Sequence, residues 1–271
     1  MSYEFGFDLE KLLIAENITK HELNLIRNPP IESVPLSISD KQLICFYLAC
    51  DRDIDYSRKT IKIYYEFRRK ETRIFSNLDV CCEEAKIFFQ NHLYYISKSS
   101  ENEGLCFFTI KSSKISVFNI EFLMKYSNIL YEIFLHRNGP AKHYTLIIDL
   151  KFFTVKHLAK LNVSMLRKLF RYIQEAIPAK IKIFHFVNQP WFIQKGISII
   201  QPLMKAELFE LFQFHTDGSN LNLIGFPSAV LPSDYGGKLK SLEELHIANI
   251  QGMETYQNYF EAEEKQRFDF D

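Results

Sequence analysis

One segment decides the fold class: LRKLFRYIQEAIPAKIKIFHFV, residues 166–187. Its first half repeats apolar side chains at helical spacing from Leu166 to Ile177, which predicts an amphipathic helix. Its second half, residues 181–187, is a short apolar run of the kind found in strands that are covered on at least one face. A long helix leading into a buried strand predicts an α/β domain.

The same alternation extends outward from this segment. Residues 105–110, 144–149 and 211–215 have the apolar composition of strands. A second helical stripe lies between the first two of them and consists of Phe122, Tyr126, Ile129 and Ile133. Strands joined by long crossover helices predict a mixed, largely parallel sheet flanked by helices.

The ends of the chain carry helix signals alone. Before residue 92 the sequence predicts two short amphipathic helices and then helices over 40–50, 53–71 and 83–91. Asp51, Asp53 and Asp55 begin like a calcium loop, but Tyr56 stands where such a loop needs glycine, so they are interpreted as a helix start. After residue 240 we expect a helix over 241–262 and a frayed acidic tail.

Composition excludes several classes of protein. The 33 basic residues balance the 33 acidic ones, so no net field attracts the whole molecule to nucleic acid. The acidic start lacks a secretory signal and no apolar run reaches the roughly 20 residues of a membrane span, which predicts a cytoplasmic protein. The five cysteines have neither zinc nor disulfide spacing, so no metal is expected.

Motifs for catalysis are missing from the sequence. We find neither phosphate-binding glycine loop, nor a nucleophile elbow, nor a metalloprotease pair of histidines. His185 and His215 fall on predicted strands, where either would serve as a general base beside Asp149 or Asp217, or as an ordinary core residue. No catalytic residue is therefore assigned, and an enzyme is not expected.

The aromatic content and one apolar segment raise the question of a cavity. The 25 Phe and 14 Tyr fit either a dense core or a ligand pocket. Residues 188–214 carry little charge before Lys205 and fit either a buried helix or a movable apolar cover that closes a cavity in water and contacts lipid when open.

Three motifs resemble the CRAL-TRIO lipid-binding family, in the branch that contains alpha-tocopherol transfer protein, cellular retinaldehyde-binding protein and clavesins. LPSDYGG, residues 231–237, is the most specific. FYLACDRDID (46–55) with YYEFR (64–68) is similar to the N-terminal helical signature of the family. HFVNQP (185–190), followed by IQPL (200–203), is similar to the strand that leads into its gate helix.

This resemblance, which covers about residues 40–240, implies the domain organisation. It implies a small all-helical N-terminal domain (1–92), a CRAL-TRIO lipid-binding domain with a mobile gate helix (93–240), and a C-terminal helix with an acidic tail (241–271). It also implies that the protein needs no cofactor and holds a lipophilic ligand instead.

On this interpretation the predicted pocket residues come from two helices, two strands and the gate. They are Phe122, Tyr126, Ile129, Ile133, Tyr144, Leu146, Ile148, Phe170, Ile177, Phe184, Phe186, Trp191, Ile197, Ile200 and Leu203. The resemblance further implies candidate phosphate-binding positions at Lys180 and Lys182. Their partner positions are Glu207 and Leu211, which are not basic and leave a headgroup site incomplete.

The expected function is that of a carrier. It would bind one retinoid, carotenoid, tocopherol or sterol-like molecule and exchange it with membranes, as a cytoplasmic protein peripheral to the bilayer. Phe122 and Tyr126 replace small polar residues of the tocopherol carrier, so tocopherol itself is not expected. The alternatives are a phosphoinositide or phospholipid transfer protein, drawn to anionic lipid, and a membrane-docking regulatory module with constitutively bound lipid.

Overall fold

A computed structural model describes residues 4–269, apart from the side chain of residue 223. A five-stranded sheet organises the fold, with the strands side by side in sequence order. The first pair is antiparallel and the others are parallel, as predicted for a mixed sheet. The strands are β1 (His92–Lys98), β2 (Glu103–Ile110), β3 (His143–Asp149), β4 (Ile181–Val187) and β5 (Phe212–Phe214).

The register of the sheet gives each face its own core. Leu146 pairs with Phe184 and Ile148 with Phe186, and because strand side chains alternate, these four lie on one face. That face packs under α7 (Ile120–Asn138), α9 (Val163–Glu175) and the short α10 (Ile193–Ile200). The other face carries a smaller cluster around Val187, whose further members are Leu105, Phe107, Ile147, Leu221, Leu231, Tyr235 and Leu242.

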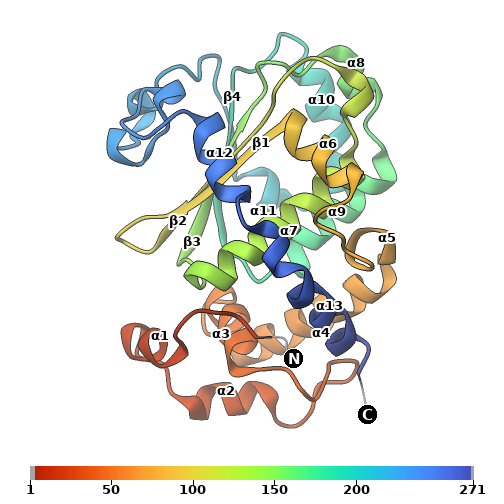
Figure 1. Ribbon diagram of the computed structural model, residues 1–271, viewed down its shortest axis with the longest axis vertical. Coiled ribbons are helices and arrows are strands. Elements are labelled where there is room, and N and C mark those ends of the chain that lie inside the picture. Colours follow the sequence, from red (N-terminus) through yellow and green to blue (C-terminus); the bar gives the residue numbers. More distant parts are fainter. Residues whose placement is uncertain (1–3, 270–271) are drawn as a thin grey trace.

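The LPSDYGG motif closes this smaller cluster. The Tyr235 hydroxyl donates to Asp149 Oδ2 at the end of β3 (3.0 Å), and Asp234 accepts a hydrogen bond from the backbone N–H of Leu242. A Cβ on Gly237 would stand 1.8 Å from the Leu231 carbonyl oxygen, so only glycine fits there. The motif therefore joins the sheet to α12 (Leu242–Ile250), which crosses in front of β1 in Figure 1.

The first four helices of the chain gather at the lower end of the molecule, below the sheet, whereas the next two lie higher, beside the sheet (Figure 1). Asp53 caps its helix by accepting from the Tyr56 N–H (2.8 Å), which confirms that the aspartates start a helix. Ser39 and Gln42 form a capping box at the start of α3. The elements are α1 (Leu9–Glu16), α2 (Lys20–Arg27), α3 (Asp40–Ala49), α4 (Ile54–Lys70), α5 (Thr72–Phe75) and α6 (Glu83–Asn91).

A buried ionic cluster ties three parts of the chain together. Arg68 of α4 pairs with Glu132 of α7 and with Glu263 of the last helix, α13 (Gln257–Arg267). Arg267 lies 3.7 Å from Glu263 and donates to the Phe75 carbonyl oxygen (2.7 Å). All four charged side chains are buried.

Two expectations about the elements were wrong. The acidic C-terminal segment was expected to fray, but it is helical as far as Arg267. The ionic cluster holds α13 against α4. The single helix expected over 241–262 is interrupted at Gly252, whose φ of 74° ends α12 and leads into a 3-10 turn, Met253–Tyr256. Strand β1 was not predicted either.

Three further short elements lie between β3 and β5 in the chain. They are α8 (Val155–Ala159), the 3-10 turn Gln201–Leu203 and α11 (Ala206–Phe209). Among the described residues, no helix is both long and apolar enough to cross a membrane.

Candidate functional site

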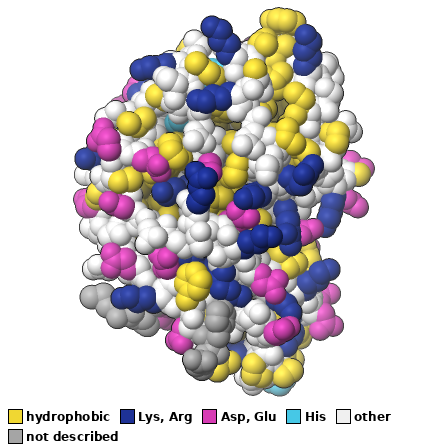
Figure 2. All heavy atoms as spheres, turned by 90° about the vertical axis from the view of Figure 1, so that its right-hand side faces the viewer, with side chains coloured by type: hydrophobic (Ala, Val, Ile, Leu, Met, Phe, Trp, Pro, Cys, Tyr) yellow, Lys and Arg dark blue, Asp and Glu magenta, His cyan; other side chains and the backbone are white. Residues whose placement is uncertain are grey.

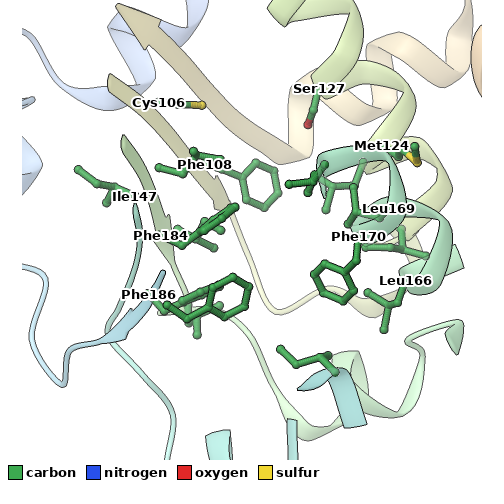
Figure 3. A pocket seen from close by; sticks show the side chains of 18 of the residues that line it. Cys106, Phe108, Met124, Ser127, Ile147, Leu166, Leu169, Phe170, Phe184 and Phe186 are labelled. Atoms are coloured by element: carbon green, nitrogen blue, oxygen red, sulfur yellow. The ribbon is translucent and has the colours of Figure 1, made fainter. Parts of the chain in front are cut away.

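A cavity of about 320 Å³ lies between the sheet and the helices α7, α9 and α10. All five strands form its floor, because the side chains that point to this face alternate with those of the smaller cluster. Figure 3 shows Phe108, Phe184 and Phe186 projecting from the strands toward the helices. The strand residues are Tyr94, Ile96, Cys106, Phe108, Ile110, Tyr144, Leu146, Ile147, Ile148, Asp149, Ile181, Phe184, Phe186, Phe212 and Phe214.

The helices form the opposite wall. In Figure 3, Leu166, Leu169 and Phe170 of α9 face the strand phenylalanines across the cavity. The helical residues are Ile120, Leu123, Met124, Ser127, Asn128 and Tyr131 of α7, Leu158 of α8, Leu166, Leu169, Phe170, Tyr172 and Ile173 of α9, and Ile193, Gly196, Ile197 and Ile200 of α10. Most of this lining is hydrocarbon, which favours an apolar occupant over water.

Most polar groups in the lining are already bonded within the protein. The Tyr131 hydroxyl donates to the Pro178 carbonyl oxygen (2.9 Å), and the Tyr144 hydroxyl accepts from the Ala141 N–H (3.0 Å). Burial raises the pKa of both phenols, so both stay neutral at physiological pH. The two tyrosines therefore present mainly the apolar faces of their rings to a ligand.

Asp149 is the carboxylate in the lining, and its oxygens are occupied. Asp149 Oδ1 accepts from the Asn188 amide and from the Lys151 N–H, both at 2.8 Å. Asp149 Oδ2 accepts from Tyr235. A cationic ligand would have to displace these bonds, so the lining favours an uncharged occupant.

Nine of the predicted pocket residues line the cavity. They come from β3, β4, α9 with the turn after it, and α10, where a strand period of two or a clear apolar helix face identifies the buried side. They are Tyr144, Leu146, Ile148, Phe170, Ile177, Phe184, Phe186, Ile197 and Ile200.

The stripe predicted on α7 was the wrong face of that helix. Phe122, Tyr126, Ile129 and Ile133 do not line the cavity. Tyr126 instead stacks near Phe88 of α6, with 4.9 Å between ring centroids, and donates to Glu84 (2.8 Å). Because α7 is apolar on several sides, its periodicity does not reveal which side faces the cavity.

Two predicted gate residues also lie outside the lining. Trp191 is 82% exposed, in the turn that enters α10 and one residue before its N-cap Phe192. Leu203 packs half-buried at the end of the turn after α10. Ser127 and Asn128 were not predicted, because two polar residues on a largely apolar helix do not form a periodic pattern. Tyr94 and Ile96 were not predicted, because strand β1 was not.

Each candidate phosphate-binding lysine is paired with a carboxylate. Lys180 pairs with Asp51, and Lys182 lies 3.5 Å from Glu103. Both lie at the start of β4, whereas α10 follows its end, roughly 20 Å away along a seven-residue strand. Lys205, nearer to α10, pairs with Glu175 (2.9 Å).

His185 of β4 and His215, the residue after β5, bond to each other. His185 Nδ1 and His215 Nε2 are 2.9 Å apart, on the face of the sheet away from the cavity. Burial and the neighbouring His215 lower the pKa of His185 to about 4. Asp149 and Asp217 bond to other groups, and Asp217 accepts from Ser219. The general-base arrangement considered from sequence is therefore not formed.

Comparison with known proteins agrees with this geometry. The CRAL/TRIO domain family matches residues 89–237. Clavesin-2 of Homo sapiens and of Rattus norvegicus is 39% identical over 98 residues, which is 35% of this chain and 29% of each clavesin. Clavesin-1 of Xenopus laevis is 38% identical over the same length. The chain thus matches less than a third of the length of these curated relatives.

The fold also resembles a solved structure. The crystal structure of Sfh5 superposes with a TM-score of 0.56, covering 97% of this chain and 89% of that one at 13% identity. The family match spans more than half of the chain and includes the sheet, the cavity walls and the LPSDYGG motif. The chain belongs to the CRAL/TRIO domain family of lipid-binding proteins.

Proposed function

We propose that this protein carries one uncharged, retinoid-, carotenoid-, tocopherol- or sterol-like molecule in the cavity and exchanges it with membranes. The observation that carries the proposal is the cavity itself. Its volume of about 320 Å³ lies at the lower end of ligand pockets, roughly 300–1,000 Å³. Its lining is apolar, and its one carboxylate is fully engaged.

The energetics require a gate. A ligand with ten buried methylene equivalents gains about 8 kcal/mol on leaving water, so release into water is slow. Helix α10 is the candidate gate, since Ile193, Ile197 and Ile200 supply one wall from a helix of only eight residues. Outward movement of α10 would open the cavity with little other rearrangement.

The outer surface beside α10 fits a bilayer. Trp191 is exposed and Lys195 Nζ lies 5.9 Å from its ring centroid. Phe192 connects this site to the loop after β3 through Phe153, with 6.4 Å between ring centroids, and that loop exposes Phe152. In Figure 2, hydrophobic side chains gather along the upper part of this side of the molecule, with Lys and Arg around them. An aromatic with flanking lysines suits the membrane interface.

The two alternative functions have less support. A phospholipid or phosphoinositide carrier needs free cations at the ligand headgroup, and Lys180 and Lys182 are both paired with carboxylates. A regulatory module would use the basic face of α4, but Arg58 donates to the Ile26 carbonyl oxygen and Lys62 pairs with Glu32. These contacts within the chain engage two of the cations on that face.

The test is uptake of lipid by the purified protein. Retinol, a sterol and phosphatidylcholine are offered in vesicles, and the bound lipid is identified by native mass spectrometry and solvent extraction. We expect one neutral lipid per chain. Leu146→Trp fills the cavity floor and should abolish uptake, whereas Leu36→Trp at an exposed position should not. A wild-type protein that stays empty in every mixture would contradict the proposal.

A further inference from the structure

We propose that the cavity selects a lipid alcohol, whose hydroxyl is held by Ser127 and Asn128 on α7; this inference rests on the proposed carrier function. Both residues line the cavity in a wall that is otherwise hydrocarbon or internally bonded. Figure 3 shows the Ser127 oxygen directed from α7 toward the space between the helices and the sheet. Neither residue belongs to the apolar helical stripes from which the pocket residues were predicted.

The other polar side chains of the lining are engaged. Tyr131, Tyr144 and Asp149 have the partners described above. Tyr94 and Cys106 hydrogen-bond to each other. Tyr172 hydrogen-bonds to Arg68. None of these groups needs a ligand to satisfy it.

Ser127 and Asn128 are different. The Asn128 amide nitrogen donates back to the Met124 carbonyl oxygen (2.7 Å). Within residues 4–269, its oxygen Oδ1 and the Ser127 hydroxyl have no hydrogen-bond partner. The cavity therefore presents one acceptor and one group that both donates and accepts, on adjacent residues of a single helix.

This pair defines the chemistry of the bound group. A ligand hydroxyl donates to Asn128 Oδ1 and accepts from the Ser127 hydroxyl, so both protein groups are satisfied. A carbonyl only accepts, which leaves Asn128 Oδ1 without a donor. A hydrocarbon leaves both groups unbonded in an apolar cavity, which is unfavourable. An anionic headgroup finds no Lys or Arg among the described lining residues. The preferred ligand is thus an apolar skeleton with one hydroxyl.

The experiment compares two lipids with the same skeleton. A C20 isoprenoid alcohol and the corresponding hydrocarbon are offered to the full chain in phosphatidylcholine vesicles, and bound lipid is quantified after extraction. We expect the wild type to prefer the alcohol by at least about tenfold, one hydrogen bond's worth of selectivity. Ser127→Ala and Asn128→Leu should each lower alcohol binding by about tenfold and leave hydrocarbon binding unchanged.

The matched control is Asn138→Leu. Asn138 lies on the same helix and makes the same contact to the residue four before it, the Phe134 carbonyl oxygen (3.0 Å), but it does not line the cavity. Hydrocarbon uptake by each variant shows that its cavity is folded. Equal wild-type binding of the two lipids, or variants that keep the preference, would refute the alcohol site while leaving the carrier function intact. Failure of the wild type to bind either lipid would refute both.

Discussion

Replacing Trp191 by Ala tests whether the surface beside α10 enters membranes. The side chain is 82% exposed, so the protein itself gains little from it. A tryptophan side chain offers up to about 250 Å², and at about 25 cal/mol per Å² the exposed part is worth roughly 5 kcal/mol if fully transferred. Insertion to half that depth gives about 2.5 kcal/mol, or roughly a 60-fold loss of vesicle partitioning in the variant.

The assay is co-flotation with neutral phosphatidylcholine vesicles over a range of lipid concentrations. Neutral lipid removes the contribution of Lys195 to attraction by anionic headgroups, so the measured change reports apolar insertion. Ile14→Ala is the matched control, because Ile14 is 80% exposed on α1, at the lower end of the molecule in Figure 1. Unchanged partitioning of Trp191→Ala, or an equal loss in the Ile14 variant, would show that this surface does not dock.

Three further predictions concern stability. Arg68→Leu leaves Glu132 buried without its ion partner and should lower the free energy of unfolding by about 3–5 kcal/mol in urea titrations, and adding Glu132→Leu should recover part of it; a double variant as unstable as the single one would contradict this. Gly237→Ala forces a Cβ into the Leu231 carbonyl oxygen and should lower the melting temperature by several degrees, on the order of a 1–3 kcal/mol loss; an unchanged melting curve would argue against a tight turn. In the folded protein the pKa of His185 is lowered from 6.5 to about 4, so its contribution to stability is full above pH 6.5 and is lost as pH falls toward 4. His185→Gln should reduce the slope of the unfolding free energy against pH in this range by up to about 1 kcal/mol per pH unit. An unaltered slope would show that other groups cause the pH dependence.

The buried ionic cluster also bears on function. It joins α4, α7 and α13, and α7 supplies the wall with Ser127 and Asn128. Arg68 thereby contacts the same helix that carries this wall. Burial of two arginines and two glutamates gives little net stability compared with apolar packing, but removal of one partner is costly, so the cluster specifies how the N-terminal helices dock.

Local sequence patterns determined the order and type of most elements. Strand periods, helix caps and the LPSDYGG motif depend on residues close in the chain, so they identified four of the five strands, the aspartate-capped helix and the family. The predicted pocket residues on β3 and β4 line the cavity because strand side chains point to the same face at every second residue.

Tertiary packing alone decided which side of α7 faces the cavity, where β1 joins the sheet and how α13 is buried. Helix α7 is apolar on several sides, so its orientation is set by α6, α9 and the sheet around it rather than by its own period. The charges of the ionic cluster lie far apart in sequence, and each resembles a solvated surface residue until the others are placed beside it. Ser127 and Asn128 likewise become notable only once every other polar group in the cavity has found its partner.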